Sequence, residues 1–340
     1  LGSLFFLMIH HLVGGAWGFA LRRVLEAATR TLPLMALLFL PLLAGMPTLY
    51  SWIGEEAAHD GLIQAKAWYL NVPGFVIRSA VCFAVWGLLV FLFNRWSNRQ
   101  DETGDPVLSR PLRMWAGPGV VLYVLTATVA SWDWGMSLDP HWFSSLYGPW
   151  FMVSQGLTTL AFGILVLSAL SRFSPMDEIA KPNVFHDIGN LTFAFVILWA
   201  YMTFSQFLII WSGNLPEETP YYLARVDGGW MGIALVLTIF HFALPVFLLL
   251  IRFNKLKPRV LSGIAWLILA MRFVDLYWAI YPAFSPGRVQ LGWVLFVVPA
   301  ALVAVFTWCF LGQLKKRPLV PMHDPRFEVE PELMKKDDDA

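Results

Sequence analysis

Nine long apolar stretches dominate this sequence, and each is long enough to cross a membrane as an α-helix. They cover residues 4–21, 32–50, 72–93, 114–132, 146–170, 188–211, 229–251, 260–281 and 291–312. Because a helix rises 1.5 Å per residue, about 20 apolar residues cross the ~30 Å hydrocarbon core. The sequence therefore predicts an all-α polytopic membrane protein with nine transmembrane helices.

Composition supports this class and narrows the chemistry. Hydrophobic residues make up 58% of the 340 residues and charged residues only 14%, which excludes an ordinary soluble domain. The two cysteines, Cys82 and Cys309, both lie inside apolar stretches and far apart in the sequence. The chain has no CxxC or CxxCH motif, so we expect no covalently bound haem, iron–sulfur cluster, disulfide or metal site. We also expect no nucleic-acid partner.

The connections between the stretches differ sharply in basic content. Alternate connections and the C-terminal segment together hold nineteen Lys and Arg residues, whereas the connections of the opposite side hold only Lys66, Arg225 and Arg288. Cytoplasmic connections are enriched in Lys and Arg. The asymmetry predicts that the basic connections and the C-terminus are cytoplasmic and that residues 131–148 face outward. Residues 1–312 form the predicted membrane domain, and residues 313–340 a polar cytoplasmic tail.

The connection at residues 131–148, SWDWGMSLDPHWFSSLYG, combines five aromatic rings with Asp133, Asp139 and His141. Trp and Tyr favour the membrane interface, because an apolar ring carries a polar edge. This connection resembles one in an integral membrane subunit of alternative complex III, a bacterial quinol:cytochrome c (or other acceptor) oxidoreductase. The strings HDIGNLTFAFVILWAYMTFSQFLIIWSGNLPEETPYYL at 186–223 and RFVDLYWAIYPAF at 272–284 resemble the same F subunit, which is related to the polysulfide-reductase type of membrane anchor.

The resemblance implies a fold and a set of partners. It implies helical bundles with ten helices in the intact chain, so one helix is expected to precede Leu1. The implied partners are a sister membrane subunit of the polysulfide-reductase type, an outer-face iron–sulfur subunit, cytochrome c subunits and lipid, in the bacterial cytoplasmic membrane. Iron–sulfur clusters and haem c are then expected in the partners, with quinone as a ligand of the complex. This chain would be a non-redox subunit that supports quinol oxidation.

Polar residues inside the predicted spans are candidates for a proton path, because an ionisable group in hydrocarbon is costly unless it faces a partner or water. At 100° per residue, one arc of the helix over 188–211 and its entry carries His186, Asp187, Asn190, Tyr201 and Ser205. An interior helix face with satisfied polar groups explains the same pattern without any conduction.

Two later spans add three candidates. Arg272 and Asp275 are three residues apart, so they can pair on one helix face, either as a structural ion pair or for proton transfer. His241 lies in mid-span and can titrate near neutral pH, or serve as a hydrogen-bonded core residue. Ligation of a b-type haem by His241 with His10 or His11 is a weaker alternative, and the resembled subunit carries no haem.

Four residues near the outer face are candidates for quinone or partner contacts. Arg78 either snorkels to the interface or holds an anionic or quinone oxygen. Asp133, Asp139 and His141 either pass protons and dock a partner, or form a structural turn that begins at Asp139-Pro140. We expect docking both here and at the connection 212–227, since binding residues concentrate on connections held by a rigid scaffold.

Two other functions fit the same sequence. A secondary transporter or channel would also carry intramembrane charges and prolines. A purely structural anchor would differ from a proton-conducting subunit only in the effect of mutating the polar residues.

Overall fold

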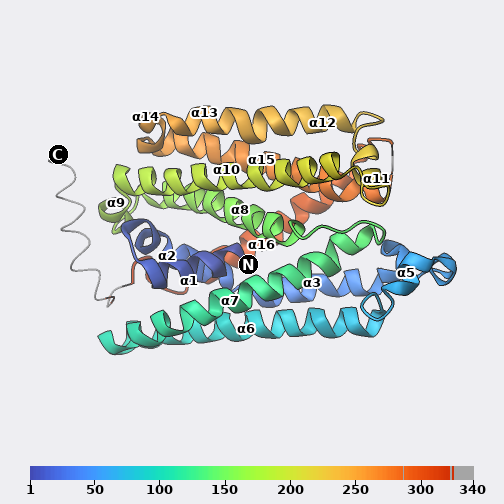
Figure 1. Cartoon of the computed structure of the whole chain (residues 1–340). Coiled ribbons are helices and arrows are strands. Elements are labelled where there is room, and N and C mark those ends of the chain that lie inside the picture. Colours follow the sequence, from blue (N-terminus) through green and yellow to red (C-terminus); the bar gives the residue numbers. More distant parts are fainter. Residues whose placement is uncertain (286, 322–323, 325–340) are drawn as a thin grey trace.

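The computed structural model describes residues 1–285, 287–321 and 324, and these form helices and connections without a strand (Figure 1). Within these described residues, seven helical segments are long and apolar enough to cross a membrane. They run over Val72–Thr103, Pro106–Leu138, Tyr147–Leu170, Pro182–Gly213, Trp230–Leu250, Pro258–Ala283 and Val294–Leu314. The number rises to eight if one bent pair of helices forms a single span. The chain is thus a multi-pass, all-helical membrane protein.

The individual helices have the following bounds. They are α1 (Gly2–Val13), α2 (Ala16–Thr29), α3 (Leu32–Ala44), α4 (Met46–Leu49), α5 (Gly61–Ala65), α6 (Val72–Thr103), α7 (Ser109–Trp134), α8 (Tyr147–Leu170), α9 (Met176–Ile179), α10 (Pro182–Gly213), α11 (Thr219–Leu223), α12 (Trp230–Val236), α13 (Leu244–Leu250), α14 (Arg252–Leu256), α15 (Pro258–Ile280) and α16 (Val294–Leu314). A π-helical segment, Leu237–Ala243, joins α12 to α13.

The prediction of nine spans is wrong at the N-terminal end of the chain. Residues 4–21 do not form one helix, because α1 ends at Val13 and the chain turns at Gly14 and Gly15, whose φ angles of 77° and 99° favour glycine. Helices α1 and α2 then pack against each other. A Cβ on Gly18 would lie 2.2 Å from His10 Nδ1, so the missing side chain allows this close approach.

The second predicted span, 32–50, is also shorter than expected. Helix α3 ends at Ala44, and it continues from α2 across a bend of 42°. Pro33 has no N–H to donate at the start of α3, which weakens the backbone hydrogen bonding across the bend. The bent α2–α3 pair therefore provides at most one crossing where the sequence suggested two.

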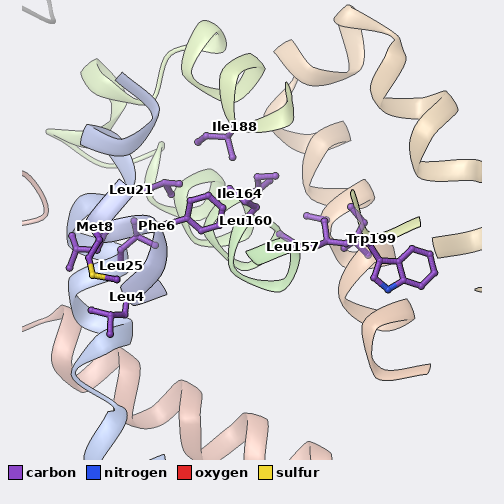
Figure 2. Packing of buried hydrophobic residues seen from close by; sticks show 14 of the residues in the cluster. Leu4, Phe6, Met8, Leu21, Leu25, Leu157, Leu160, Ile164, Ile188 and Trp199 are labelled. Atoms are coloured by element: carbon purple, nitrogen blue, oxygen red, sulfur yellow. The ribbon is translucent and has the colours of Figure 1, made fainter. Parts of the chain in front are cut away.

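Helix α8 lies at the centre of the packing and contacts α1, α2, α7, α10 and α15. Its buried face includes Leu157, Leu160 and Ile164, and Figure 2 shows Leu160 and Ile164 near Phe6 of α1 and Leu21 of α2. Small residues on this helix let neighbours approach, as at Gly156, where a Cβ would lie 2.3 Å from the ring of Phe195.

The connections gather at two ends of the molecule. One end holds α9, α14 and the connection between α6 and α7, and we call it the basic end (Figure 1). The opposite end holds α5, α11 and the 131–148 connection. Part of the segment predicted as a polar tail packs at the basic end, where Val320 is buried and Asp324 binds Arg22. Residues 325–340 lie outside the described residues.

Candidate functional site

Four buried side chains meet between α10, the π-helical segment and α15, and we call them the intramembrane cluster: Trp199, His241, Arg272 and Asp275. The Arg272 guanidinium donates to the Asp275 carboxylate, so the contact expected from their spacing is present. Trp199 Nε1 donates to Asp275 Oδ2 over 3.1 Å. The rings of Trp199 and His241 meet edge to face, with centroids 4.2 Å apart. Trp199 therefore links the histidine to the ion pair.

Burial makes this cluster energetically demanding. Asp275 and Arg272 are almost fully shielded, and His241 has no exposed surface. Removing charges from water costs several kcal/mol per ion, and a pair repays that cost only with good geometry and further hydrogen bonds. Asp275 has two donors, but both ring nitrogens of His241 and Nε of Arg272 have no hydrogen-bond partner among the described residues. These three nitrogen atoms can therefore still form hydrogen bonds, for example to a bound molecule or water.

The local backbone at His241 departs from an ordinary α-helix. Pro245 lacks the N–H that would bond to the carbonyl of residue 241, and Leu244 N–H instead reaches back to Ile239 O, five residues earlier. π-helical turns inside α-helices occur frequently at functional sites, because the extra residue changes where side chains point. Here the widened turn contains His241.

A cavity of about 680 Å³ runs beside the cluster, between α10, the α12 segment and α15. Trp199 and Asp275 form part of its wall, together with Thr203, Tyr222 and Arg225. Most of the other lining side chains are apolar. An apolar cavity with a few convergent polar groups is the usual form of a small-molecule site.

The polar residues at the start of α10 form a separate group at the basic end. Asn190 Nδ2 donates to His186 Nδ1 over 3.3 Å, and Lys255 Nζ of α14 donates to Asn190 Oδ1 over 2.6 Å. His186 Nδ1 also lies 3.9 Å from the carboxylate of Asp187. Burial lowers the pKa of Lys255, and the neighbouring charge of Arg252 adds to this effect.

The structure does not join this group to the intramembrane cluster. From Asn190 to Trp199 the helix axis rises about 13 Å. The intervening buried positions include Val196, which is apolar, and Thr192, whose hydroxyl donates to the carbonyl of Ile188. Tyr201 lies on the outside of the helix, 61% exposed, at the wall of the cavity. Among the described residues, the polar group at the start of α10 and the intramembrane cluster therefore do not form one continuous row.

Near the opposite end, two of the predicted outer contacts bind each other. Arg78 Nε donates to Asp133 Oδ2 over 2.8 Å, and Arg78 Nη2 donates to Asp133 Oδ1 and to the carbonyl of Tyr69, each over 3.0 Å. The guanidinium also lies 3.9 Å from the centre of the Tyr69 ring. Arg78 therefore ties α6 to α7 instead of simply extending toward the interface.

His141 and its neighbours join the 131–148 connection to the segment before α6. His141 Nε2 lies 2.6 Å from Asp60 Oδ2, and Lys66 Nζ donates to the carbonyl of Pro140 over 2.7 Å. The hydrogen bond with His141 lowers the pKa of Asp60, with smaller contributions from the backbone N–H groups of residues 62 and 63. Asp139 lies on the same connection and is partly exposed.

The 131–148 connection also contacts the connection around α11. Trp142 stacks on Tyr221, with ring centroids 3.8 Å apart. Arg225 lies over the Tyr221 ring and donates to the carbonyls of Tyr221 and Ala279. The two connections are thus packed against each other through buried side chains.

Sequence reasoning missed Trp199, Asp60 and Arg225. A signal existed for Trp199. Tryptophan usually lies at the membrane interface, so a tryptophan in mid-span carries an N–H group that needs a partner inside the protein. Asp60 and Arg225 lie in short connections without a repeating pattern, so their contacts could not be predicted from the sequence.

The described residues offer few side-chain groupings that suit a metal ion or a haem. Among the described residues, no group of three or more His, Cys, Asp or Glu side chains is placed to hold a metal ion. His10 and His11 contact Trp17 and Phe93, whereas the ring contact of His241 is with Trp199. No protein-family model and no curated protein matches this chain.

Proposed function

We propose that this chain is a membrane subunit of a quinol:acceptor oxidoreductase of the alternative complex III type, in which it serves as a scaffold and conducts protons. The observation that carries the proposal is the intramembrane cluster, where the buried Arg272/Asp275 pair is linked through Trp199 to His241. A buried ionisable group in a membrane-spanning segment is a functional candidate by default. The resemblance of residues 131–148, 186–223 and 272–284 to the F subunit supplies the kind of complex.

Electrons in this proposal pass through partner subunits. The cysteines of the chain, Cys82 and Cys309, are single thiols within separate helices. Iron–sulfur clusters and haem c are assigned to an outer-face iron–sulfur subunit and cytochrome c subunits, and a sister membrane subunit completes the membrane part. The complex belongs in the bacterial cytoplasmic membrane, with the basic end facing the cytoplasm.

Quinone is the proposed ligand of the membrane part. The 680 Å³ cavity beside the cluster supports contact with a quinone here, because its lining is mostly apolar while Asp275 and Arg225 provide polar groups. Arg78 and Asp133 are less suited to this role, since they bind each other.

The proton role is tested by Asp275→Asn and His241→Gln in the complete complex, reconstituted in liposomes. Asn keeps the shape of Asp275 and removes its proton-accepting carboxylate, so both variants are expected to assemble but to lower proton release per quinol oxidised. Ile239→Ala is the matched control, because this residue lies on the same π-helical segment, is 50% exposed and does not line the cavity. Normal oxidation and unchanged proton release in both cluster variants would assign the cluster to structure alone.

A secondary transporter is the second candidate, and the same cavity favours it, since transporters bind substrates near the bilayer midplane at interrupted helices. Gentle purification separates the two functions. A transporter is expected to purify without haem-bearing partners, whereas a subunit of the oxidoreductase should carry them along.

A further inference from the structure

A second cavity, of about 730 Å³, opens at the basic end between α6 and the start of α3. It is separate from the intramembrane cluster and shares no lining residue with the cavity described above. Its rim carries four arginines and one carboxylate: Arg30, Arg95, Arg99, Arg317 and Glu102. The cavity therefore has a strong excess of positive charge.

Three of these arginines have no salt bridge within the described part of the chain. Arg95 and Arg99 are exposed on α6, and the acidic side chain nearest in sequence, Asp101, binds Arg23 instead. Arg30 Nε is shielded from solvent and has no hydrogen-bond partner among the described residues. Only Arg317 is paired, with Glu26 at 3.3 Å. Three positive charges at this rim thus have no salt-bridge partner among the described residues, and Glu102 is the one carboxylate in the lining.

The other side of the cavity is apolar and partly exposed. Leu32, Pro33, Val90 and Phe91 line it, and Phe91 is 56% exposed. Counted from Val72, the helix axis rises about 35 Å to Arg95, slightly more than the hydrocarbon thickness. With Val72 at the opposite boundary of the hydrocarbon core, Arg95 and Arg99 reach the depth of the lipid headgroups, and Val90 and Phe91 lie about one to two turns deeper, at the depth of the acyl chains.

We propose that this cavity binds an anionic phospholipid, with the phosphate held by Arg30, Arg95 and Arg99 and an acyl chain along Val90 and Phe91. Arginine suits this ligand because its guanidinium offers a planar fork of donors to phosphate oxygens. Basic pockets between membrane helices bind such headgroups through the same combination of charge and apolar contact. A free phosphate would use the arginines but would leave the apolar wall without a contact.

The test measures cardiolipin binding to the purified full chain by native mass spectrometry during a lipid titration. The variant Arg95→Gln/Arg99→Gln removes two rim charges, and each is worth roughly fivefold in affinity at a membrane surface, so roughly 30-fold weaker binding is expected. The control, Arg110→Gln/Arg113→Gln, removes the same charge from exposed positions of α7 at the same end but outside the cavity. It is expected to bind cardiolipin within twofold of the original chain.

Equal weakening in the two double variants would overturn the proposal, because it would show attraction to the whole basic end. Unchanged binding in Arg95→Gln/Arg99→Gln would overturn it as well. The original chain is also titrated in 10 mM inorganic phosphate and against phosphatidylcholine. Retained cardiolipin binding in phosphate supports a lipid site, whereas displacement by phosphate would assign the arginines to a free anion. Arg30→Gln gives a second variant, expected to weaken binding with a single charge removed.

Discussion

The chemistry of single residues in this chain is set by which neighbour each one meets. Arg272 and Asp275 were predictable as a pair, because three residues of helix place them on one face. The partner of Arg78 was not predictable, since Asp133 comes from another helix 55 residues later. Trp199 and His241 likewise meet only because α10 packs beside the π-helical segment. Local spacing identified candidates, and tertiary packing decided their contacts.

The Asp60–His141 contact gives a residue-scale prediction about pH. The pKa of Asp60 is lower in the folded chain than in the unfolded chain. Its carboxylate therefore stabilises the fold fully above the unfolded pKa of about 3.9, and this contribution disappears as the pH falls through the folded pKa. Asp60→Asn should lower the melting temperature at pH 7, and the difference from the original chain should vanish on acidification.

The measurement is thermal unfolding in detergent between pH 7 and pH 3. Glu217→Gln serves as the control, because this glutamate is exposed in the connection around α11 and is not among the groups that shift the pKa of Asp60. The control should follow the original chain at every pH. A difference between Asp60→Asn and the original chain that stays constant with pH would contradict the assigned role of the carboxylate.

At the scale of elements, the sequence predicted long, uninterrupted apolar helices well and broken ones poorly. The later spans, from α6 onward, have a helix in the structure over each predicted stretch. The first two stretches are also apolar, yet Gly14 and Gly15 interrupt the first, and Gly45 separates α3 from α4 in the second. The length of an apolar stretch shows whether it can cross a membrane. It does not show whether tertiary contacts stabilise a turn or a bend within that stretch. The π-helical segment was hidden for the same reason.

The close packing of α1 on α2 gives an element-scale prediction. A Cβ on Gly18 would lie 2.2 Å from Nδ1 and 2.9 Å from Cβ of the buried His10, so a methyl group there must push the two helices apart. Overpacking of a core typically costs about 1–3 kcal/mol. Gly18→Ala should lower stability by this amount when the chain is unfolded in mixed micelles.

Gly117→Ala provides the matched control, because a Cβ at that position on α7 would meet nothing within 4 Å. It should leave stability unchanged or raise it slightly, since alanine favours a helix more than glycine does. Equal effects of the two substitutions would show that α1 and α2 are not held together at Gly18.

At the scale of the whole molecule, the basic connections still lie at one end, although the N-terminal stretches form fewer crossings than the sequence predicted. Arg22 and Arg23 still lie at the basic end, where they bind Ser97 near the end of α6. The α2–α3 pair then leads toward the opposite end, and the later spans run alternately back and forth between the two ends (Figure 1). The basic residues therefore gather at one end of the described bundle, as the alternation along the sequence predicted.

The final prediction concerns which end faces the cytoplasm. Positively charged connections are retained on the cytoplasmic side, so the basic end is expected inside. Single cysteines at Glu217 and Lys257, both exposed and at opposite ends, report the orientation in a background with Cys82→Ala and Cys309→Ala. An impermeant thiol reagent on the outside of the cytoplasmic membrane should label position 217 and not 257. Both positions should react after that membrane is permeabilised, which shows that each thiol is accessible. Labelling of 257 with protection of 217 before permeabilisation would reverse the orientation, and the proposed proton route and outer docking surface would then have to be reassigned to opposite sides.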